Sequence, residues 1–84
     1  MSPSVDNLSI GRRIRFFRKE AGLTLSELGE RVGRAASQIS TIENGKRETS
    51  VTLLASIAQA LGTEVADLLD PTPVDGRQAL ELEA

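Results

Sequence analysis

The amino-acid sequence predicts an all-α fold, a compact domain of five short helices. Apolar residues recur at helical spacing in five segments, glycine or proline ends each segment, and no alternation of apolar and polar residues is long enough for a strand. The 84 residues suffice for one modest core and leave no room for a substrate cleft with walls of its own. One small domain is therefore expected.

The first predicted helix is capped by Ser9, whose hydroxyl can accept from the free N–H groups of the first turn, and it ends at Gly22. Its apolar residues recur every three or four positions: Ile10, Ile14, Phe17 and Ala21. The remaining faces carry an arginine cluster of Arg12, Arg13 and Arg15. We expect this cluster to be a solvated face.

The second predicted helix opens with a Thr-x-x-Glu capping box, Thr24 to Glu27, and ends after about two turns at Gly33. A third helix is expected from about Ala36 to Asn44. Gly45 follows it and suits the left-handed conformation that often ends a helix. The second and third helices are thus joined by a tight turn that contains a glycine.

Ser50 is predicted to cap a fourth helix, which Gly62 ends, and Thr63 to cap a short fifth, which Pro71 stops. The predicted organisation is an N-terminal arm at 1–8, a folded domain at 9–70, and a linker with the start of a further segment at 71–84. The last residues, RQALELEA, are either a frayed tail or the first turns of a longer protein.

The third helix has two unlike sides. At about 100° per residue, Ile39 and Ile42 point one way with Ala35 near them. Short polar side chains point the other way: Ser37, Ser40, Thr41 and Asn44. Long Lys and Glu side chains would suit a merely solvated surface better. The pattern therefore favours a surface that another molecule approaches closely.

Composition excludes most catalytic chemistry. The chain has no Cys and no His, and thus no disulfide, thiol nucleophile, imidazole base or zinc site of the usual ligand types. Three carboxylates, Glu27, Glu30 and Glu43, form no evident acid and base pair. We expect no catalytic residue, no metal and no cofactor. No apolar run approaches the length of about 18 residues that a membrane span needs, so a soluble cytoplasmic protein is expected.

Charge is divided along the chain more sharply than its formal net charge of −2 suggests. Residues 1–63 hold nine basic and six acidic residues, whereas residues 64–84 hold one basic and six acidic residues. A polyanion partner is compatible with this distribution, because electrostatic binding depends on where charge lies. The weak total charge disfavours tight, indiscriminate binding to nucleic acid.

Two helices joined by a tight turn, the second with an exposed face of short polar side chains, form a helix-turn-helix arrangement whose second helix can enter the DNA major groove. Residues 10–69 resemble the phage-repressor-like helix-turn-helix family, which includes the lambda and 434 repressors and Cro proteins. The motifs of this resemblance are IGRRIRFFRKEAGLTLSELGERVG, QISTIENGKR, LLASIAQALG and VADLL. The pattern Ile-x-x-Ile-Glu-Asn-Gly-Lys at 39–46 is the most specific of them.

The resemblance implies a lambda-repressor-like DNA-binding domain with its helix-turn-helix at 25–44 and double-stranded DNA as partner. The positions that read bases in relatives are, in this chain, Ala36, Ser37 and Thr41, flanked by Gln38 and Ser40. The candidate phosphate-binding residues are Ser26, Arg34, Asn44, Lys46 and Arg47. Arg18 and Glu43 match a partly buried salt bridge of relatives and are assigned to structure.

Three positions depart from the family pattern. Ala36 can offer only a methyl contact to thymine, which weakens direct readout. Ala35 lies where the family usually has a Ser or Thr cap, a change of about 1 kcal/mol in helix stability. Leu25 replaces a phosphate-binding Gln, so that contact is lost or supplied by Ser26 or the backbone.

The predicted mechanism is sequence-specific recognition of duplex DNA by a bacterial or phage transcriptional regulator. A homodimer on an inverted repeat is expected, with its interface around the fifth helix or in a segment after Ala84, where an effector domain absent from this chain could follow. The alternative is a protein-interaction module of the same fold, an antitoxin-like or anti-repressor partner. Simpler interpretations stay open for two groups of residues: a solvated surface for Ser37, Ser40 and Thr41, and loop charges without a DNA contact for Lys46 and Arg47. For the first helix the alternative to a solvated arginine face is a face close to the DNA backbone.

Overall fold

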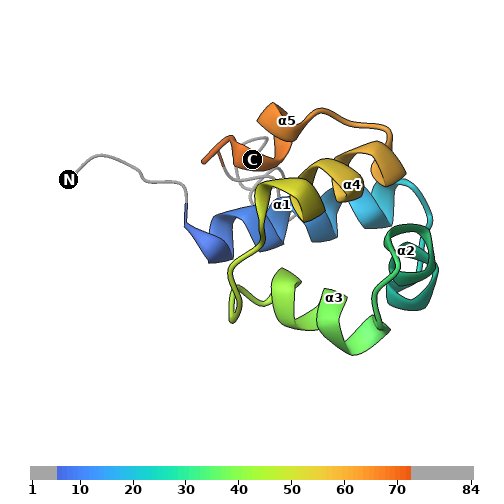
Figure 1. Cartoon of the computed structure of the whole chain (residues 1–84). Coiled ribbons are helices and arrows are strands. Elements are labelled where there is room, and N and C mark those ends of the chain that lie inside the picture. Colours follow the sequence, from blue (N-terminus) through green and yellow to red (C-terminus); the bar gives the residue numbers. More distant parts are fainter. Residues whose placement is uncertain (1–5, 73–84) are drawn as a thin grey trace, which may run out of the picture.

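Five helices make up the regular structure of residues 6–72, the part of the chain that the computed structural model describes (Figure 1). They are α1 (Asn7–Glu20), α2 (Leu25–Val32), α3 (Ala36–Glu43), α4 (Val51–Leu61) and α5 (Val65–Leu69). The predicted all-α, five-helix fold is confirmed. The segments 1–5 and 73–84, which hold most of the predicted arm and linker, lie outside the described residues.

Most helix ends form as the sequence predicts. In the capping box of α2, the Thr24 N–H donates to a Glu27 carboxylate oxygen at 2.8 Å, and the Glu27 N–H donates to the Thr24 hydroxyl at 3.0 Å. The hydroxyl of Ser50 accepts from the Leu53 N–H at the start of α4. Gly33 and Gly62 end α2 and α4 in the left-handed conformation. These ends depend on local chemistry, which a sequence displays directly.

Two predicted caps are wrong. Helix α1 begins at Asn7 and places Ser9 inside its first turn, because the carboxylate of Asp6 already accepts from the Ser9 N–H at 2.7 Å. Helix α5 begins at Val65, and Thr63 does not cap it. Instead the carboxylate of Asp67 reaches back and accepts from the Glu64 N–H at 3.0 Å and from the Thr63 hydroxyl.

One core joins all five helices. Its buried side chains are Ile14, Leu28, Ile39, Ile42, Leu54, Ile57, Ala58 and Leu68. Because α3 contributes two isoleucines to this core, its inner side is fixed and its outer side faces away from the rest of the fold. In Figure 1 α3 lies along the lower side of the molecule, with α1 and α4 above it. Among the described helices, none is long and apolar enough to cross a membrane.

Helices α1 and α3 approach each other closely at Gly11. A Cβ atom added at Gly11 would overlap the carbonyl oxygens of Ile42 and Glu43 at the end of α3. The contact therefore requires glycine, and it holds the carboxyl end of α3 against α1.

The predicted solvated arginine face is wrong for Arg13, which is only 7% exposed. Its guanidinium donates to the carbonyl oxygens of Asp67 and Thr72, each at 2.7 Å, and lies 3.7 Å from the carboxylate of Asp70. The last carbonyls of a helix lack intrahelical donors, and Arg13 supplies a donor to one of them, that of Asp67 in α5. Arg12 and Arg15 are exposed, as predicted.

Candidate nucleic-acid interface

The turn between α2 and α3 is folded tightly onto α2. After Gly33, the Arg34 N–H donates to the carbonyl oxygen of Gly29 at 2.8 Å. A Cβ atom added at Gly29 would overlap the carbonyl oxygen of Arg34. The sequence analysis missed this role of Gly29, although a glycine inside a helix, which costs about 1 kcal/mol relative to alanine, is a signal of close packing.

Helix α3 has the two sides that its sequence predicts. Ile39 is fully buried and Ile42 is 3% exposed. On the opposite side Ser37 and Asn44 are exposed, while the other candidate residues, Ala36, Gln38, Ser40 and Thr41, are half-buried. The outer side is therefore a shallow surface of small groups on a helix that the core holds in place.

Several polar groups of this surface already bond to the backbone of α3. The hydroxyl of Thr41 donates to the Ser37 carbonyl oxygen at 2.8 Å, and the Asn44 amide nitrogen donates to the Ser40 carbonyl oxygen at 2.8 Å. The oxygens of Thr41 and Asn44 keep lone pairs that can accept from a ligand. Ser37 makes no side-chain hydrogen bond within residues 6–72, so its hydroxyl can both donate and accept.

Gln38 caps α3. Ala35, at the N-cap position, has no side-chain acceptor, and the side-chain oxygen of Gln38 accepts the Ala35 N–H at 3.0 Å. This bond is half of a capping box. The amide nitrogen of Gln38 remains as a donor, so base contact by Gln38 stays a prediction that is compatible with its capping role.

In the turn after α3, side chains are free to bind a phosphate, whereas two backbone N–H groups are already hydrogen-bonded. Gly45 has φ 72°, and the N–H groups of Gly45 and Lys46 donate back to the carbonyl oxygens of Ile42 and Thr41. Backbone donation to phosphate from these two residues is therefore reduced. The side chains of Asn44, Lys46 and Arg47 are exposed and remain the phosphate candidates of this turn.

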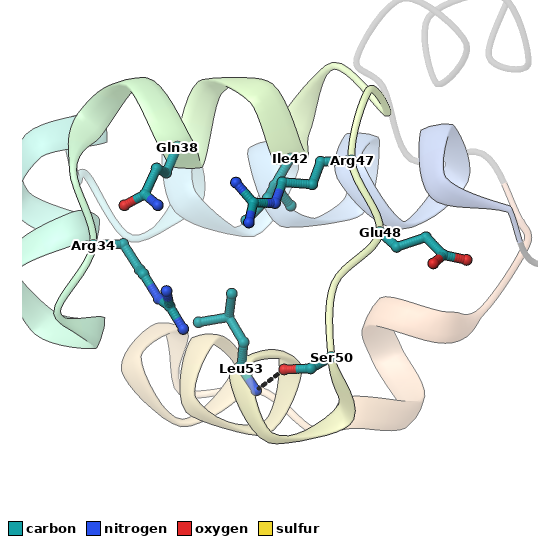
Figure 2. Close-up of a pocket in the computed structure, with 7 residues that line it drawn as sticks. All are labelled: Arg34, Gln38, Ile42, Arg47, Glu48, Ser50 and Leu53. Atoms are coloured by element: carbon teal, nitrogen blue, oxygen red, sulfur yellow. Dashed lines mark hydrogen bonds between the residues drawn. The ribbon is translucent and has the colours of Figure 1, made fainter.

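Arg34 and Arg47 come together although 13 residues separate them in the sequence. They line one hollow of about 150 Å³, which lies between α3, α4 and the connecting loop (Figure 2). Its lining residues are Arg34, Gln38, Ile42, Arg47, Glu48, Ser50 and Leu53. Ser26, the remaining phosphate candidate, is exposed on the first turn of α2 and does not line this hollow.

Arg18 and Glu43 form the predicted ion pair, and both are buried. Arg18 donates to the two carboxylate oxygens of Glu43 at 2.6 and 3.0 Å and to the Leu23 carbonyl oxygen at 2.9 Å. The hydrogen bond to Glu43 raises the pKa of Arg18 above its ordinary value. The pair ties the end of α3 to α1 and to the loop that precedes α2.

Within the described residues, His, Cys, Asp and Glu side chains form no group of three or more that could hold a metal ion.

The model of the helix-turn-helix domain family matches residues 9–70. The transcriptional regulator SinR of Bacillus subtilis (strain 168) is 41% identical over 78 residues, which cover 88% of this chain and 70% of SinR.

Solved structures are similar as well. SinR in complex with DNA has a TM-score of 0.69 and 42% identity, over 73% of this chain and 98% of that one. The clp gene regulator ClgR from C. glutamicum has a TM-score of 0.73 and 41% identity, over 75% of this chain and 81% of that one. Hydroxypropylphosphonic acid epoxidase from S. wedmorenis has a TM-score of 0.75 at 23% identity, over 86% of this chain and 38% of the enzyme. At this identity the likeness shows the fold alone.

Proposed function

Because the chain belongs to the helix-turn-helix domain family, we propose that it is a transcriptional regulator that binds double-stranded DNA through α3. The observation that carries the proposal is the outer side of α3, where small polar groups stand on a helix anchored from behind by Ile39 and Ile42. SinR, which was crystallised in complex with DNA, is similar over most of this domain.

In the proposed complex α3 enters the major groove, which is about 12 Å wide and admits a helix. Ser37 and Thr41 read base edges, Ala36 contacts a thymine methyl group, and Gln38 and Ser40 flank them. Basic side chains at the borders of α3 contact phosphates, which fixes the position of the helix but carries no sequence information. A regulator of bacterial or phage genes would act on DNA in the cytoplasm.

We infer that the regulator is a homodimer on an inverted repeat. One α3 reads only a few base pairs, and proteins of this architecture gain specificity from two half-sites about 34 to 36 Å apart. Helix α5 is the proposed interface, because Leu69 is 37% exposed whereas the neighbouring Leu68 is fully buried.

The first experiment is selection and sequencing from a random duplex DNA pool with the purified chain. We expect enrichment of an inverted repeat. A dimer that neutralises about six to ten phosphates should give a slope of log K against log salt of about −5 to −9. A slope near zero would contradict DNA binding.

Variants then assign the reading residues. Ser37→Ala and Thr41→Ala should each weaken binding to the enriched sequence by about three- to tenfold, because each removes a hydroxyl from the interface. Ser56→Ala is the matched control, since Ser56 is an exposed serine of α4 outside the proposed interface. Equal affinities for all three variants would remove Ser37 and Thr41 from the interface.

The second candidate function is a protein-interaction module of the same fold, which Ala35 and Ala36 favour because neither offers a hydrogen bond to a base. The apolar side chain of Leu25 does not add to such a surface, since it is half-buried against the core. Retained partner binding with no DNA enrichment would select this function. We propose no enzymatic activity, and assays for hydrolysis of nucleic acid or peptide should give no product.

A further inference from the structure

We propose that Arg34 and Arg47 act together as a clamp for one phosphate group of the DNA backbone, held in the hollow beside α3. The inference rests on the proposed function and goes beyond it, because it joins two residues from different loops into a single binding site. It also states which surface of the domain meets the strand that borders α3.

The geometry of the two side chains carries the proposal. Arg34 lies in the turn before α3, and Arg47 lies in the loop after it. Figure 2 shows both side chains extending into the hollow, Arg34 toward Leu53 and Arg47 across Ile42. Each guanidinium offers a planar fork of N–H donors, which matches the oxygens of a phosphate. A phosphate between them would accept from both sides.

Electrostatics favours an anion at this place. The ion pairs of residues 6–72 are Arg13 with Asp70 and Arg18 with Glu43, so neither Arg34 nor Arg47 has a carboxylate partner there. Glu48 also lines the hollow, but its carboxylate points away from the two guanidinium groups in Figure 2. Two neighbouring positive charges repel each other, and a phosphate between them would replace this repulsion by two attractions.

The hollow has the size and walls of a phosphate site. Its volume of about 150 Å³ is enough for a phosphate group. Ile42 and Leu53 contribute apolar walls, and Ile42 is only 3% exposed. An apolar wall lowers the local dielectric constant and strengthens charge-assisted hydrogen bonds at the rim.

The location points to a phosphate of DNA as the occupant. Gln38, a flanking residue of the proposed base-reading surface, lines the same hollow. A helix that lies in the major groove is bordered by the phosphates of the strands on either side. Arg34, Arg47 and Ser50 are exposed at the rim, so a strand beside α3 can reach the hollow without a change in the fold.

The test is a scan of the enriched duplex with single neutral methylphosphonate linkages, performed on the wild-type chain and on Arg34→Gln and Arg47→Gln. In the wild type, the linkage held by both arginines should be one of several sensitive positions in each half-site and should lose about tenfold in affinity, since a charge-assisted contact is lost there. In both variants the loss at that same position should shrink. Arg31→Gln is the control, because Arg31 is an exposed arginine of α2 that does not line the hollow.

The salt slope gives a second measurement. The double variant should lower its magnitude by about 0.9 per half-site, the value for one phosphate, whereas two separate phosphates would lower it by about 1.8. Responses of the two variants at two different linkages, or at none, would overturn the clamp while DNA binding itself stands. Saturation of the Arg34 and Arg47 NMR signals by inorganic phosphate, with no sensitive linkage, would overturn it in favour of a free phosphate compound. A wild type that binds no duplex would overturn both this inference and the proposed function.

Discussion

Arg18 links three parts of the domain through one guanidinium group. It bonds to both oxygens of Glu43 at the end of α3 and to the carbonyl oxygen of Leu23, which follows α1. Both partners of the pair are buried, so each charge depends on the other for the interactions that water would otherwise supply.

Removal of one charge should therefore lower the free energy of unfolding by more than the intact ion pair contributes to it. Glu43→Gln is expected to lower the free energy of unfolding by about 3 to 5 kcal/mol, because Arg18 would remain charged and buried without its counter-ion. Urea unfolding followed by circular dichroism measures the change. Glu30→Gln, at an exposed position of α2, is the control and should change little. Equal losses in the two variants would mean that burial does not decide the cost.

The two buried arginines, Arg18 and Arg13, differ in how well the sequence predicts their surroundings. Arg18 and Glu43 are 25 residues apart, and only the family resemblance paired them. The sequence predicts a solvated face for Arg13 together with Arg12 and Arg15, yet the structure buries Arg13 under the end of α5. The burial of Arg13 depends on where α5 ends, and the helical periodicity of α1 does not contain that information.

Helix α3 begins without a side-chain cap from its N-cap residue. Ala35 has the extended backbone of an N-cap residue, with φ −73° and ψ 152°, but no side-chain acceptor. Ala35→Ser should raise the free energy of unfolding by about 1 kcal/mol, since a serine hydroxyl could accept from the free N–H groups of the first turn. Urea unfolding tests this, with Ala36→Ser as control inside the helix. A gain that is equal at both positions would contradict a capping effect.

The turn after α3 combines two constraints at Gly45. Its φ is 72°, and an added Cβ atom would lie 2.7 Å from the Cα atom of Leu8. Gly62 has φ 70° but open space around the added atom. Gly62→Ala should cost about 1 kcal/mol for the left-handed backbone alone, and Gly45→Ala should cost more because the start of α1 must move. Similar thermal unfolding temperatures for the two variants would exclude a steric contribution from Leu8.

Helix boundaries show which signals a sequence contains. The ends of α2 and α4 were predicted correctly because one strong cap stands at each. At α1 two capping residues compete, and Asp6 captures the N–H of Ser9. At α5 the acceptor, Asp67, comes after the N–H group that it caps instead of before it. Where two capping residues are available near one helix end, the order of residues alone does not say which of them accepts the hydrogen bond.

For the whole molecule, three carboxylates link stability to pH, two of them exposed and that of Asp67 half-buried. Hydrogen bonds from the Thr24 backbone lower the pKa of Glu27, the Thr63 hydroxyl lowers that of Asp67, and the Thr72 backbone lowers that of Asp70. A lowered native pKa means that the unfolded chain binds protons first as pH falls. Their contribution is complete above the ordinary carboxyl pKa and is lost as pH falls through the native values.

The free energy of unfolding should therefore decrease below about pH 4, near the ordinary pKa of these side chains. Urea unfolding at a series of pH values measures it. Asp67→Asn should make the curve shallower in acid, because one of the three groups no longer titrates. An unchanged slope in this variant would show that Asp67 does not contribute to the acid transition.

At this scale the candidate site was predicted in part. The outer side of α3 follows from the helical period, so its residues could be found from spacing alone. The hollow could not be found in that way, since its lining residues come from two loops and two helices that only the fold brings to one place. A site on one helix can be predicted from the spacing of its residues. A site formed by residues of different loops can be found only once the fold is known.

The division of α3 into two sides separates what the protein recognises from how it folds. Ile39, Ile42 and Glu43 hold the helix, whereas Ala36, Ser37, Ser40 and Thr41 contribute no side chain to the fully buried core. A lineage could therefore exchange these outer residues one at a time and acquire a new target sequence while the scaffold keeps its stability. Gln38 is the exception, because the residue that replaces it must also cap the helix.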